Sequence, residues 1–276
     1  MTRILFRSTA LAAAAGLTFS LSGCMVGLDT KEQVTTIPVP HVPSSGLKVT
    51  AHNGHIGVKK TGEPDVKVVA TLRMISDERL QATTIAASRD RDGILVITAT
   101  PPENLWKSNE GCAFDITLPE ARGITLKTDN GGVETSGLAG AAEIETSNGS
   151  VTVSSQDGPV RARTSNGRVE IIDASGAVDC TTSNGSVTVS LAPSSPGPVK
   201  IDTSNGAITL ALGKSFAGSI TADTSNGSIS TPEANSGHPT ANIQRQDKHH
   251  AVITIGSGKK SNLETSNGSI TIKYAD

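Results

Sequence analysis

Aromatic side chains are almost absent from this chain of 276 residues, which holds one Trp, one Tyr and four Phe. Because aromatic rings supply much of the buried area in ordinary cores, a core without them must be narrow and filled with aliphatic side chains. The chain also lacks a row of aromatic residues on which sugar rings could stack. We therefore expect a thin, aliphatic core.

Cysteine, positive charge and helical patterns are scarce as well. Three cysteines are too few for a disulfide scaffold. The formal net charge of -2 gives no electrostatic reason for nucleic-acid binding, and we predict none. Apolar residues at helical spacing are few, whereas Thr, Ser, Val, Ile and Gly dominate, so the composition favours an all-β chain.

The chain repeats one phrase, Thr-Ser-Asn-Gly, which is followed by aliphatic residues at alternate positions, as in residues 146–153. Successive asparagines of the phrase are 18 residues apart three times and 21 apart twice, and the last step of 41 spans about two periods. A period near 20 with strand-like content is typical of a solenoid. Residues 49–58 contain a worn copy of the phrase. The repeated asparagines are Asn130 (in a variant phrase), Asn148, Asn166, Asn184, Asn205, Asn226 and Asn267.

Two topologies would explain the repeat. Asn-Gly between strands is a strong hairpin signal and predicts an antiparallel meander. Alternatively, each repeat is one coil of a parallel β-solenoid, in which equivalent residues stack. One outward position carries charges of alternating sign in successive repeats, namely Glu143, Arg161, Asp179 and Lys200, followed by Thr221. Because opposite charges would be neighbours about 4.8 Å apart in a parallel stack, the pattern favours the solenoid, with coils of 18 to 21 residues.

The phrase itself is interpreted as the corner of each coil. Stacked asparagines would hydrogen-bond through their side-chain amides from one coil to the next, as in cross-β ladders. The glycine that follows is expected to supply the positive φ of a tight turn. Residues 262–275 are expected to form the final coil, after a degenerate repeat that contains residues 252–255.

Residues 1–23 are predicted to be a signal peptide. Two arginines precede a short apolar run, residues 11–21, which is too short for an ordinary membrane span. The run leads into Leu-Ser-Gly-Cys, which resembles the lipobox of bacterial lipoproteins. That resemblance implies cleavage before Cys24, a diacylglycerol on its sulfur, acylation of its new amine (for example with palmitate) and hence a lipid anchor in a membrane. The resemblance implies a lipid-anchored protein of the cell envelope. If the host is diderm, Met25 in place of Asp implies the outer membrane, on its periplasmic or surface face.

The remaining chain divides into a tether and a domain. Residues 24–45 comprise the lipidated cysteine and a Pro-rich segment that is predicted to be a flexible tether. Residues 46–276 are predicted to form the β-solenoid, with irregular coils or a cap over 46–128 and regular repeats over 129–276.

Two features of this domain are left open by the pattern. Residues 77–88 fit either a short helix with Asp77 as its N-cap or another strand. Cys112 and Cys180, the two cysteines that carry no lipid, would form a disulfide only if their Cα atoms lie within about 7 Å. Cys180 also fits an inward position as a small core residue.

The repeats, the earlier Asn-Gly strand pair and a Phe-x-Ile-x-Leu-Pro segment at residues 114–119 resemble the DUF4097 family. Members of that family are provisionally described as adhesins with β-strand repeats. The resemblance covers about residues 46–276 and is best at 146–230 and 265–272. It implies a β-solenoid and an envelope location, and it implies no established activity.

Groups that could carry out chemistry are sparse. The one surface cluster comparable with those of solenoid polysaccharide lyases and hydrolases consists of Glu143 and Glu145 beside Arg161, Arg163 and Asp179. A retaining glycosidase pair needs two carboxylates about 5 Å apart beside a sugar groove. A solvated charge ladder explains the cluster as well, so we predict no catalytic residue.

The histidines are weighed as metal ligands in the same way. His249 and His250 with His238, or His52 with His55, are the available groups. Consecutive histidines in a strand point in opposite directions, and no Cys or Asp at a ligand spacing completes a site. We therefore predict no metal site and no cofactor.

Two functional hypotheses follow. The first is a non-enzymatic, lipid-anchored envelope protein whose repetitive surface serves adhesion, scaffolding or sensing, with an envelope glycan or protein as partner. The second is a polysaccharide-active solenoid enzyme of the cell envelope. A signalling role in an envelope-stress response would leave no mark on the residues. Because stacking alone explains the repeated phrase, a local function is expected in residues 77–111, in the longer return loops and in residues 232–262.

Overall fold

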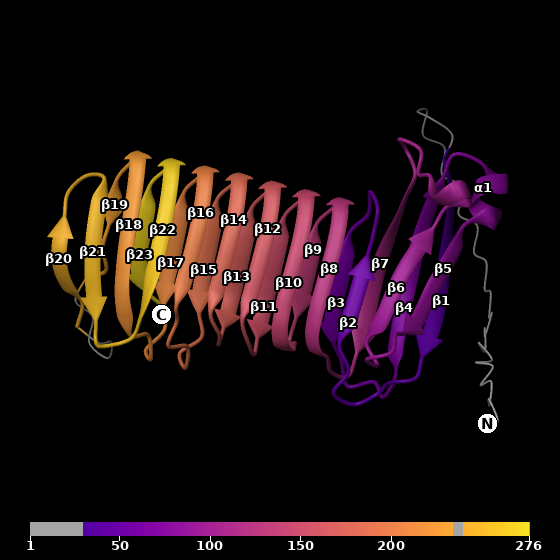
Figure 1. Ribbon diagram of the computed structural model, residues 1–276, viewed down its shortest axis with the longest axis horizontal. Coiled ribbons are helices and arrows are strands. Elements are labelled where there is room, and N and C mark those ends of the chain that lie inside the picture. The colour runs from indigo at the N-terminus through magenta and orange to yellow at the C-terminus, as the bar shows by residue number, and fades with distance from the viewer. Residues whose placement is uncertain (1–29, 234–239, 276) are drawn as a thin grey trace, which may run out of the picture.

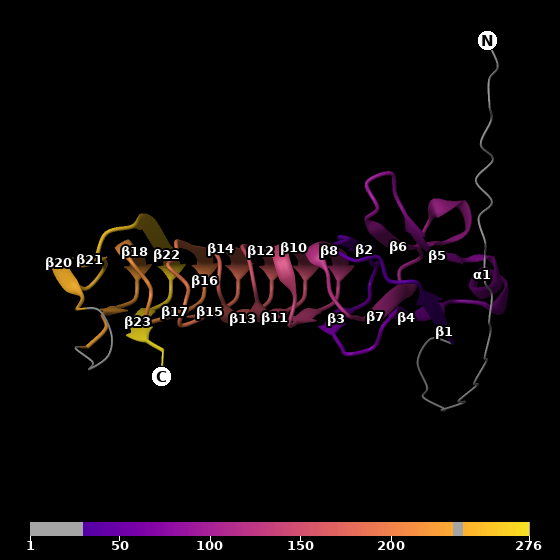
Figure 2. The same cartoon turned by 90° about the horizontal axis from the view of Figure 1, so that it is seen from below.

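The computed structural model describes residues 30–233 and 240–275, and these form an elongated body in which two long sheets lie face to face (Figures 1 and 2). One sheet has 11 strands and the other has 12, and the consecutive repeats pair in parallel. The prediction of an all-β parallel solenoid is therefore confirmed. The signal peptide and Cys24 lie outside the described residues.

The first sheet, sheet A, contains the strands that follow the Asn-Gly corners of the repeats. In spatial order its strands are β1 (Lys31–Val39), β4 (Val66–Met74), β7 (Gly111–Leu118), β3 (Ile56–Lys60), β9 (Val133–Ser136), β11 (Val151–Gln156), β13 (Val169–Ala174), β15 (Val187–Leu191), β17 (Ile208–Leu212), β23 (Ile270–Tyr274) and β19 (Ile229–Ser230).

The second sheet, sheet B, contains the strands that precede the Asn-Gly corners of the repeats. In spatial order its strands are β20 (Asn242–Gln246), β21 (His250–Ile255), β18 (Gly218–Asn226), β22 (Lys259–Asn267), β16 (Val199–Asn205), β14 (Val178–Asn184), β12 (Val160–Asn166), β10 (Ala139–Asn148), β8 (Arg122–Asn130), β2 (Leu47–Thr50), β6 (Leu95–Thr100) and β5 (Thr84–Arg89). The described helices are α1 (Asp77–Ala82) and the 3-10 turn Pro102–Asn104. Neither has the length and apolar character needed to span a membrane.

The register of the repeats decides between the two topologies. Glu143 lies opposite Arg161 on adjacent parallel strands, and Arg161 lies opposite Asp179. Asp179 is followed by Lys200 on the next strand. The alternating charges are therefore neighbours in the stack, as the solenoid requires, and an antiparallel meander of repeats is excluded.

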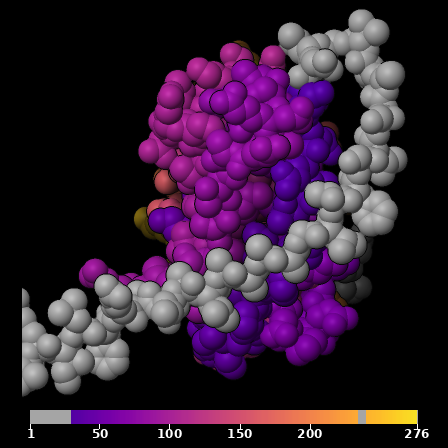
Figure 3. All heavy atoms as spheres, turned by 90° about the vertical axis from the view of Figure 1, so that its right-hand side faces the viewer, coloured from indigo at the N-terminus to yellow at the C-terminus, as the bar shows by residue number. Residues whose placement is uncertain are grey.

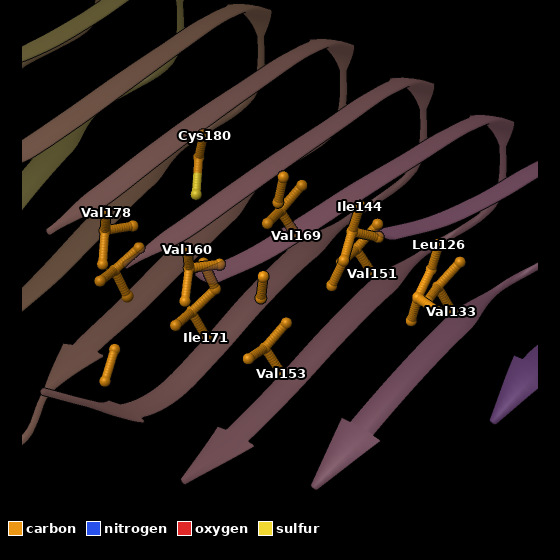
Figure 4. Close-up of a cluster of buried hydrophobic side chains, with 14 of the residues drawn as sticks. Leu126, Val133, Ile144, Val151, Val153, Val160, Val169, Ile171, Val178 and Cys180 are labelled. Carbon is orange, nitrogen blue, oxygen red and sulfur yellow. The ribbon is translucent and has the colours of Figure 1, made fainter. Parts of the chain in front are cut away.

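The core is the predicted thin layer of aliphatic side chains between the sheets (Figure 4). Ile144 and Val160 from sheet B meet Val151 and Val169 from sheet A, and all four are at most 2% exposed. Burying each such side chain contributes about 1.5–3 kcal/mol. Because each coil supplies only a few of them, stability depends on contacts between successive coils.

The C-terminal repeat does not form the end of the stack, so the prediction that residues 262–275 form the final coil is wrong. β22 pairs with β16 on one side and with β18 on the other, and β23 likewise lies between β17 and β19. After β17 the chain forms β18 and β19 two positions further out and turns back through β20 and β21. It then returns as β22 and β23, which lie between the coil of β16 and β17 and the coil of β18 and β19 (yellow between orange in Figure 1).

The N-terminal end has a similar arrangement. β2 lies between β6 and β8, and β3 lies between β7 and β9, although β6 and β7 follow them in the sequence. The first coil and the last coil of the domain are thus both flanked on two sides. Neither is exposed at an end of the stack.

Antiparallel strands cap both sheets at the N-terminal end and sheet B at the C-terminal end. β1 and β4 cover β7, β5 covers β6, and β20 with β21 covers β18. Figure 3 shows the N-terminal end of the body, where the face toward the viewer is formed by the N-terminal part of the domain (indigo to magenta). The outermost strands are then β1 and β19 in sheet A and β20 and β5 in sheet B. β19 is only two residues long, and a very short edge strand offers few groups for pairing with another chain.

The N-terminal cap corrects two predictions. Residues 31–39, assigned to the tether, form β1 instead, because their alternate side chains are partly buried as the strand pairs with β4. Residues 77–88 form both a helix and a strand, α1 and then most of β5. The helix N-cap is Ser76, whose side chain accepts a hydrogen bond from the Arg79 amide, rather than Asp77.

Candidate functional site

The corner asparagines form a continuous ladder. In every case the side-chain Nδ2 of one asparagine donates to Oδ1 of the asparagine on the neighbouring coil, at 2.7–2.9 Å for all pairs beyond Asn130. The spatial order is Asn53, Asn130, Asn148, Asn166, Asn184, Asn205, Asn267 and Asn226. The structure therefore brings all seven predicted corner residues together and adds Asn53 of the worn repeat.

The ladder ends on a polar cluster at the N-terminal cap. Asn53 Nδ2 donates to the carbonyl of Glu110 at 2.9 Å and lies 3.0 Å from Nε2 of His52. The other ring nitrogen of His52 lies 2.6 Å from Asp129, and its ring stacks on Trp106 at a centroid distance of 5.1 Å. These contacts attach the loop that contains Trp106 to Asn53, the first residue of the asparagine ladder.

Glu110 holds the same loop from below. Its carboxylate is fully buried, and it accepts hydrogen bonds from the Arg79 guanidinium and from the amides of Lys107 and Ile75. Burial opposes ionisation, but the hydrogen bonds from Arg79 and the two amides outweigh it and lower the pKa of Glu110. The loop is therefore fixed by an ionised carboxylate.

The threonine of each phrase has a role that the sequence reasoning missed. Its side chain is buried, and Oγ1 donates to the carbonyl of the corner glycine on the adjacent coil, as Thr164 does to Gly149 at 3.0 Å. Equivalent bonds of 2.8–3.3 Å recur at every phrase: Thr128, Thr146, Thr182, Thr203, Thr224 and Thr265. The repetition of Thr two residues before Asn was the available signal.

The glycine of each phrase is required for a different reason from the one predicted. The corner glycines do not have positive φ. A Cβ on Gly167 would instead lie 2.0 Å from the carbonyl oxygen of Gly149, and one on Gly185 would lie 1.9 Å from that of Gly167. Close approach of successive backbones therefore selects glycine here.

A groove of about 440 Å³ crosses four coils on the outer face of sheet B and reaches a fifth at one end. Its floor is a row of small side chains that point outward immediately before buried residues, namely Ala141, Pro159, Ala177 and Pro198. The next outward row forms a charged rim, namely Glu143, Arg161, Asp179 and Lys200. Lys260 of β22 stands at the far end of the floor.

The rim charges are not equally engaged. Arg161 pairs with Asp179 at 3.3 Å in the middle of the groove. Among the described residues, neither Glu143 at one end nor Lys200 and Lys260 at the other end forms an ion pair within 4.0 Å. The groove is therefore negative at one end, neutralised in its centre and positive at the other end.

The cluster considered for polysaccharide chemistry lies partly on this rim. Glu143 and Glu145 project from one strand on the same side, and Glu145 pairs with Lys127 at 3.2 Å while remaining 57% exposed. A glycosidase pair flanks the scissile bond from two sides of a sugar. The two carboxylates do not face each other in that way.

The remaining candidate groups are apart from one another. Cys112 and Cys180 are both free and buried, so the disulfide left open by the sequence is absent. Burial raises the pKa of the Cys112 thiol to about 12 and also raises that of Cys180.

The histidines contact carboxylates instead of one another. His55 lies 3.1 Å from Asp115, and His250 pairs with Asp223 on the next strand. His238 lies outside the described residues. In the part of the chain that the structure describes, no group of three or more His, Cys, Asp or Glu residues could hold a metal.

Comparison with known families and proteins finds one family. A domain of unknown function, DUF7330, matches residues 175–276, which run from the third Thr-Ser-Asn-Gly repeat of the ladder to the end of the chain. No curated protein matches the chain.

Several solved structures are similar over most of the chain. A provisionally assigned cell adhesion protein from Clostridium sporogenes is 17% identical, with a TM-score of 0.33, over 90% of this chain and 100% of its own. A provisionally assigned adhesin from Bacteroides fragilis is 13% identical, with a TM-score of 0.45, over 88% and 97%. A provisionally assigned lipid binding protein from Parabacteroides distasonis is 11% identical, with a TM-score of 0.29, over 88% and 97%. Identities and TM-scores this low do not transfer a function to this chain.

Proposed function

We propose that this protein is a non-enzymatic envelope lipoprotein that presents a repetitive β-solenoid surface and binds an extended ligand on it, in an adhesin-like, scaffolding or sensing role. The observation that carries the proposal is the groove on sheet B. It crosses four successive coils, so its floor and rim repeat at the spacing of parallel strands. A site of this shape suits an elongated ligand better than a compact substrate.

The ladders give the groove a fixed geometry. Each coil below the groove is held to the next by an asparagine side chain and by a buried threonine, as Asn166 and Thr164 hold their coil to that of Asn148. A ligand therefore meets a pre-organised surface and does not have to order it, which lowers the entropic cost of binding.

The envelope location rests on the sequence. The Leu-Ser-Gly-Cys motif supports lipidation of Cys24, and acyl chains on one residue would hold the protein on a membrane. Because β1 begins at Lys31, the tether in this proposal is short. The resemblance to DUF4097 supports the same location.

Lipidation and location are tested together in cells of the native host. Cells are grown with an alkyne fatty acid, fractionated, and the protein is examined for label. We expect labelled protein in the membrane fraction and unlabelled, soluble protein for the variant Cys24→Ala. Unlabelled wild-type protein in the soluble fraction would remove the lipoprotein part of the proposal.

The enzymatic alternative, in which Glu143, Glu145 and Arg161 act on a polysaccharide, is tested by turnover. The purified protein is incubated with a panel of envelope and matrix polysaccharides, and new reducing ends or unsaturated products are measured. We expect no product above the blank. Turnover that disappears in Glu143→Gln would replace the binding role with an enzymatic one.

A further inference from the structure

The ends of the groove differ in charge, and the distance between them is set by the fold. Glu143 lies on β10 and Lys200 on β16, three strand positions away, so their Cα atoms are about 14 Å apart. Lys260 lies on β22, one strand further and two residues before the partner of Lys200, so that its Cα atom is about 20 Å from that of Glu143. A ligand that satisfies both ends needs a cation and an anion separated by roughly this span.

The centre of the groove offers no free charge. Arg161 and Asp179 neutralise each other at 3.3 Å, and the floor beside them consists of Pro159 and Ala177. The middle of a bound ligand must therefore be uncharged and carry small side chains. A polyanion such as a nucleic acid or an acidic polysaccharide would place charge against Asp179 and Glu143.

The side chains of the groove floor favour a peptide over a sugar as the ligand. The groove lining contains no aromatic residue, and sugar rings in binding sites commonly stack on aromatic faces. Proline and alanine instead provide a shallow apolar strip along which an extended backbone can lie. An extended peptide rises about 3.3–3.4 Å per residue, so four residues span about 13 Å between the terminal amine and the terminal carboxylate.

We infer that the groove binds a short, extended, zwitterionic peptide of about four small residues, with its free amine at Glu143 and its free carboxylate at Lys200 and Lys260. This inference rests on the proposed binding role of the protein and names the ligand class for that role. Charge-assisted hydrogen bonds at the two ends select the length and the direction of the peptide. The neutral centre accepts any sequence of small uncharged side chains.

The test is a calorimetric titration of the full chain, purified in detergent, with synthetic peptides. The probe is tetra-alanine with free termini, compared with its N-acetyl form, its C-terminal amide and di-alanine. We expect binding of tetra-alanine, with affinity reduced about tenfold or more by either blocked terminus and lost for di-alanine, which is too short to reach both ends.

Variants connect each terminus with its partner. Glu143→Gln should remove the preference for a free amine, and the double change Lys200→Gln with Lys260→Gln should remove the preference for a free carboxylate. Glu145→Gln and Lys259→Gln carry the same charge changes beside the groove but outside its lining, and should bind like wild type. Ala177→Leu fills the middle of the exposed floor and should abolish binding without unfolding the protein.

Three results would overturn the inference. These are the absence of tetra-alanine binding, equal binding of the blocked and free peptides, and preferential binding of an uncharged linear tetrasaccharide of similar length. Fatty-acid labelling of Cys24 is independent of all three, so a failed titration leaves the location of the protein to be judged by its own experiment. A failed labelling experiment likewise leaves the peptide site standing.

Discussion

The side-chain amide of Asn267 donates to Oδ1 of Asn205 at 2.8 Å, although 62 residues separate them in the chain. Asn226, which lies between them in the sequence, occupies the next position outward and donates to Asn267. The last repeat has therefore been inserted into the ladder one place before its end. This order distinguishes the molecule from a solenoid that simply winds from its first residue to its last.

The inserted coil predicts an unusual response to truncation. Removing residues 257–276 deletes β22 and β23 and leaves β16 and β18 without the strand that joins them. We expect residues 213–256 to become sensitive to protease at concentrations that leave the full chain intact.

A matched deletion inside the stack should behave differently. Removing residues 167–184 joins Asn166 to Gly185 and restores the Asn-Gly corner, with one coil fewer. Because a solenoid is stabilised mainly by contacts between neighbouring coils, this variant should fold and resist protease. Equal protection of the two deletion variants would show that the inserted coil has no special importance.

The asparagine ladder predicts a loss of stability for Asn166→Asp. The carboxylate cannot donate to Asn148 Oδ1, and it places one oxygen against another at that contact. We expect the free energy of unfolding in urea to fall by about 1–2 kcal/mol. Ser165→Ala, an exposed change at the preceding position, is the control and should fall within about 0.5 kcal/mol of wild type.

Replacing a buried threonine of the phrase by valine should lower the stability of the protein more than the same replacement on the outer face of a sheet. Thr164→Val keeps the shape of the side chain and removes the buried hydroxyl that donates to the carbonyl of Gly149, so that this partly buried acceptor loses its partner. We expect a loss of about 1–3 kcal/mol in urea unfolding. Thr188→Val, on the outer face of sheet A, should change stability little. A similar loss for both variants would contradict the role given to the buried hydroxyl.

The corner glycines predict that one methyl group is enough to disrupt the stack. In Gly167→Ala the new Cβ meets the Gly149 carbonyl oxygen at 2.0 Å, and only a shift of backbone can relieve the contact. We expect a loss of about 3 kcal/mol or more, measured by urea unfolding. Gly62→Ala is the control, because a Cβ there has no atom within 4 Å.

The buried Glu110 predicts that the loop with Trp106 opens in acid. Its pKa is lowered, so its contribution is complete above the ordinary value of 4.5 and is lost as the pH falls through the lowered value in the folded protein. We expect protease cleavage within residues 101–109 to accelerate about tenfold or more below pH 4. An acid-active protease is needed for this measurement.

The corresponding variant separates this effect from general acid unfolding. Glu110→Gln cannot accept two charge-assisted hydrogen bonds from Arg79, and it should be cleaved rapidly at neutral pH with little further change in acid. Glu103→Gln changes an exposed carboxylate in the same loop and should keep the wild-type pH profile. A pH profile that is unchanged in Glu110→Gln would assign the acid response to another group.

Much of the regular fold could be predicted because its causes are local. Alternation at period two identified inward residues such as Val151 and Val160, and the charge order at Glu143 and Arg161 identified parallel stacking. The order of coils could not be predicted. Because the repeats are nearly identical, the sequence does not show which copies are neighbours in space. The place beside Asn205 could be taken equally well by Asn226 or by Asn267.

The candidate site was predicted less completely, for the same reason. The rim residues Glu143, Arg161, Asp179 and Lys200 come from consecutive repeats and were visible as a row. Lys260 was missed because it reaches the groove only through the inserted coil. The strand β1 was also missed, since a Pro-rich segment reads as a tether until the partner strand is known.

The inserted last coil also determines how the molecule resists being pulled apart from its C-terminus. In a simple solenoid the last coil has one neighbour, and an unfolding machine that grips that end would break one set of contacts at a time. Here β22 and β23 must slide out from between two coils, so hydrogen bonds on both sides have to break together. We therefore expect the coil of β22 and β23 to resist extraction by force more strongly than a terminal coil with one neighbour would.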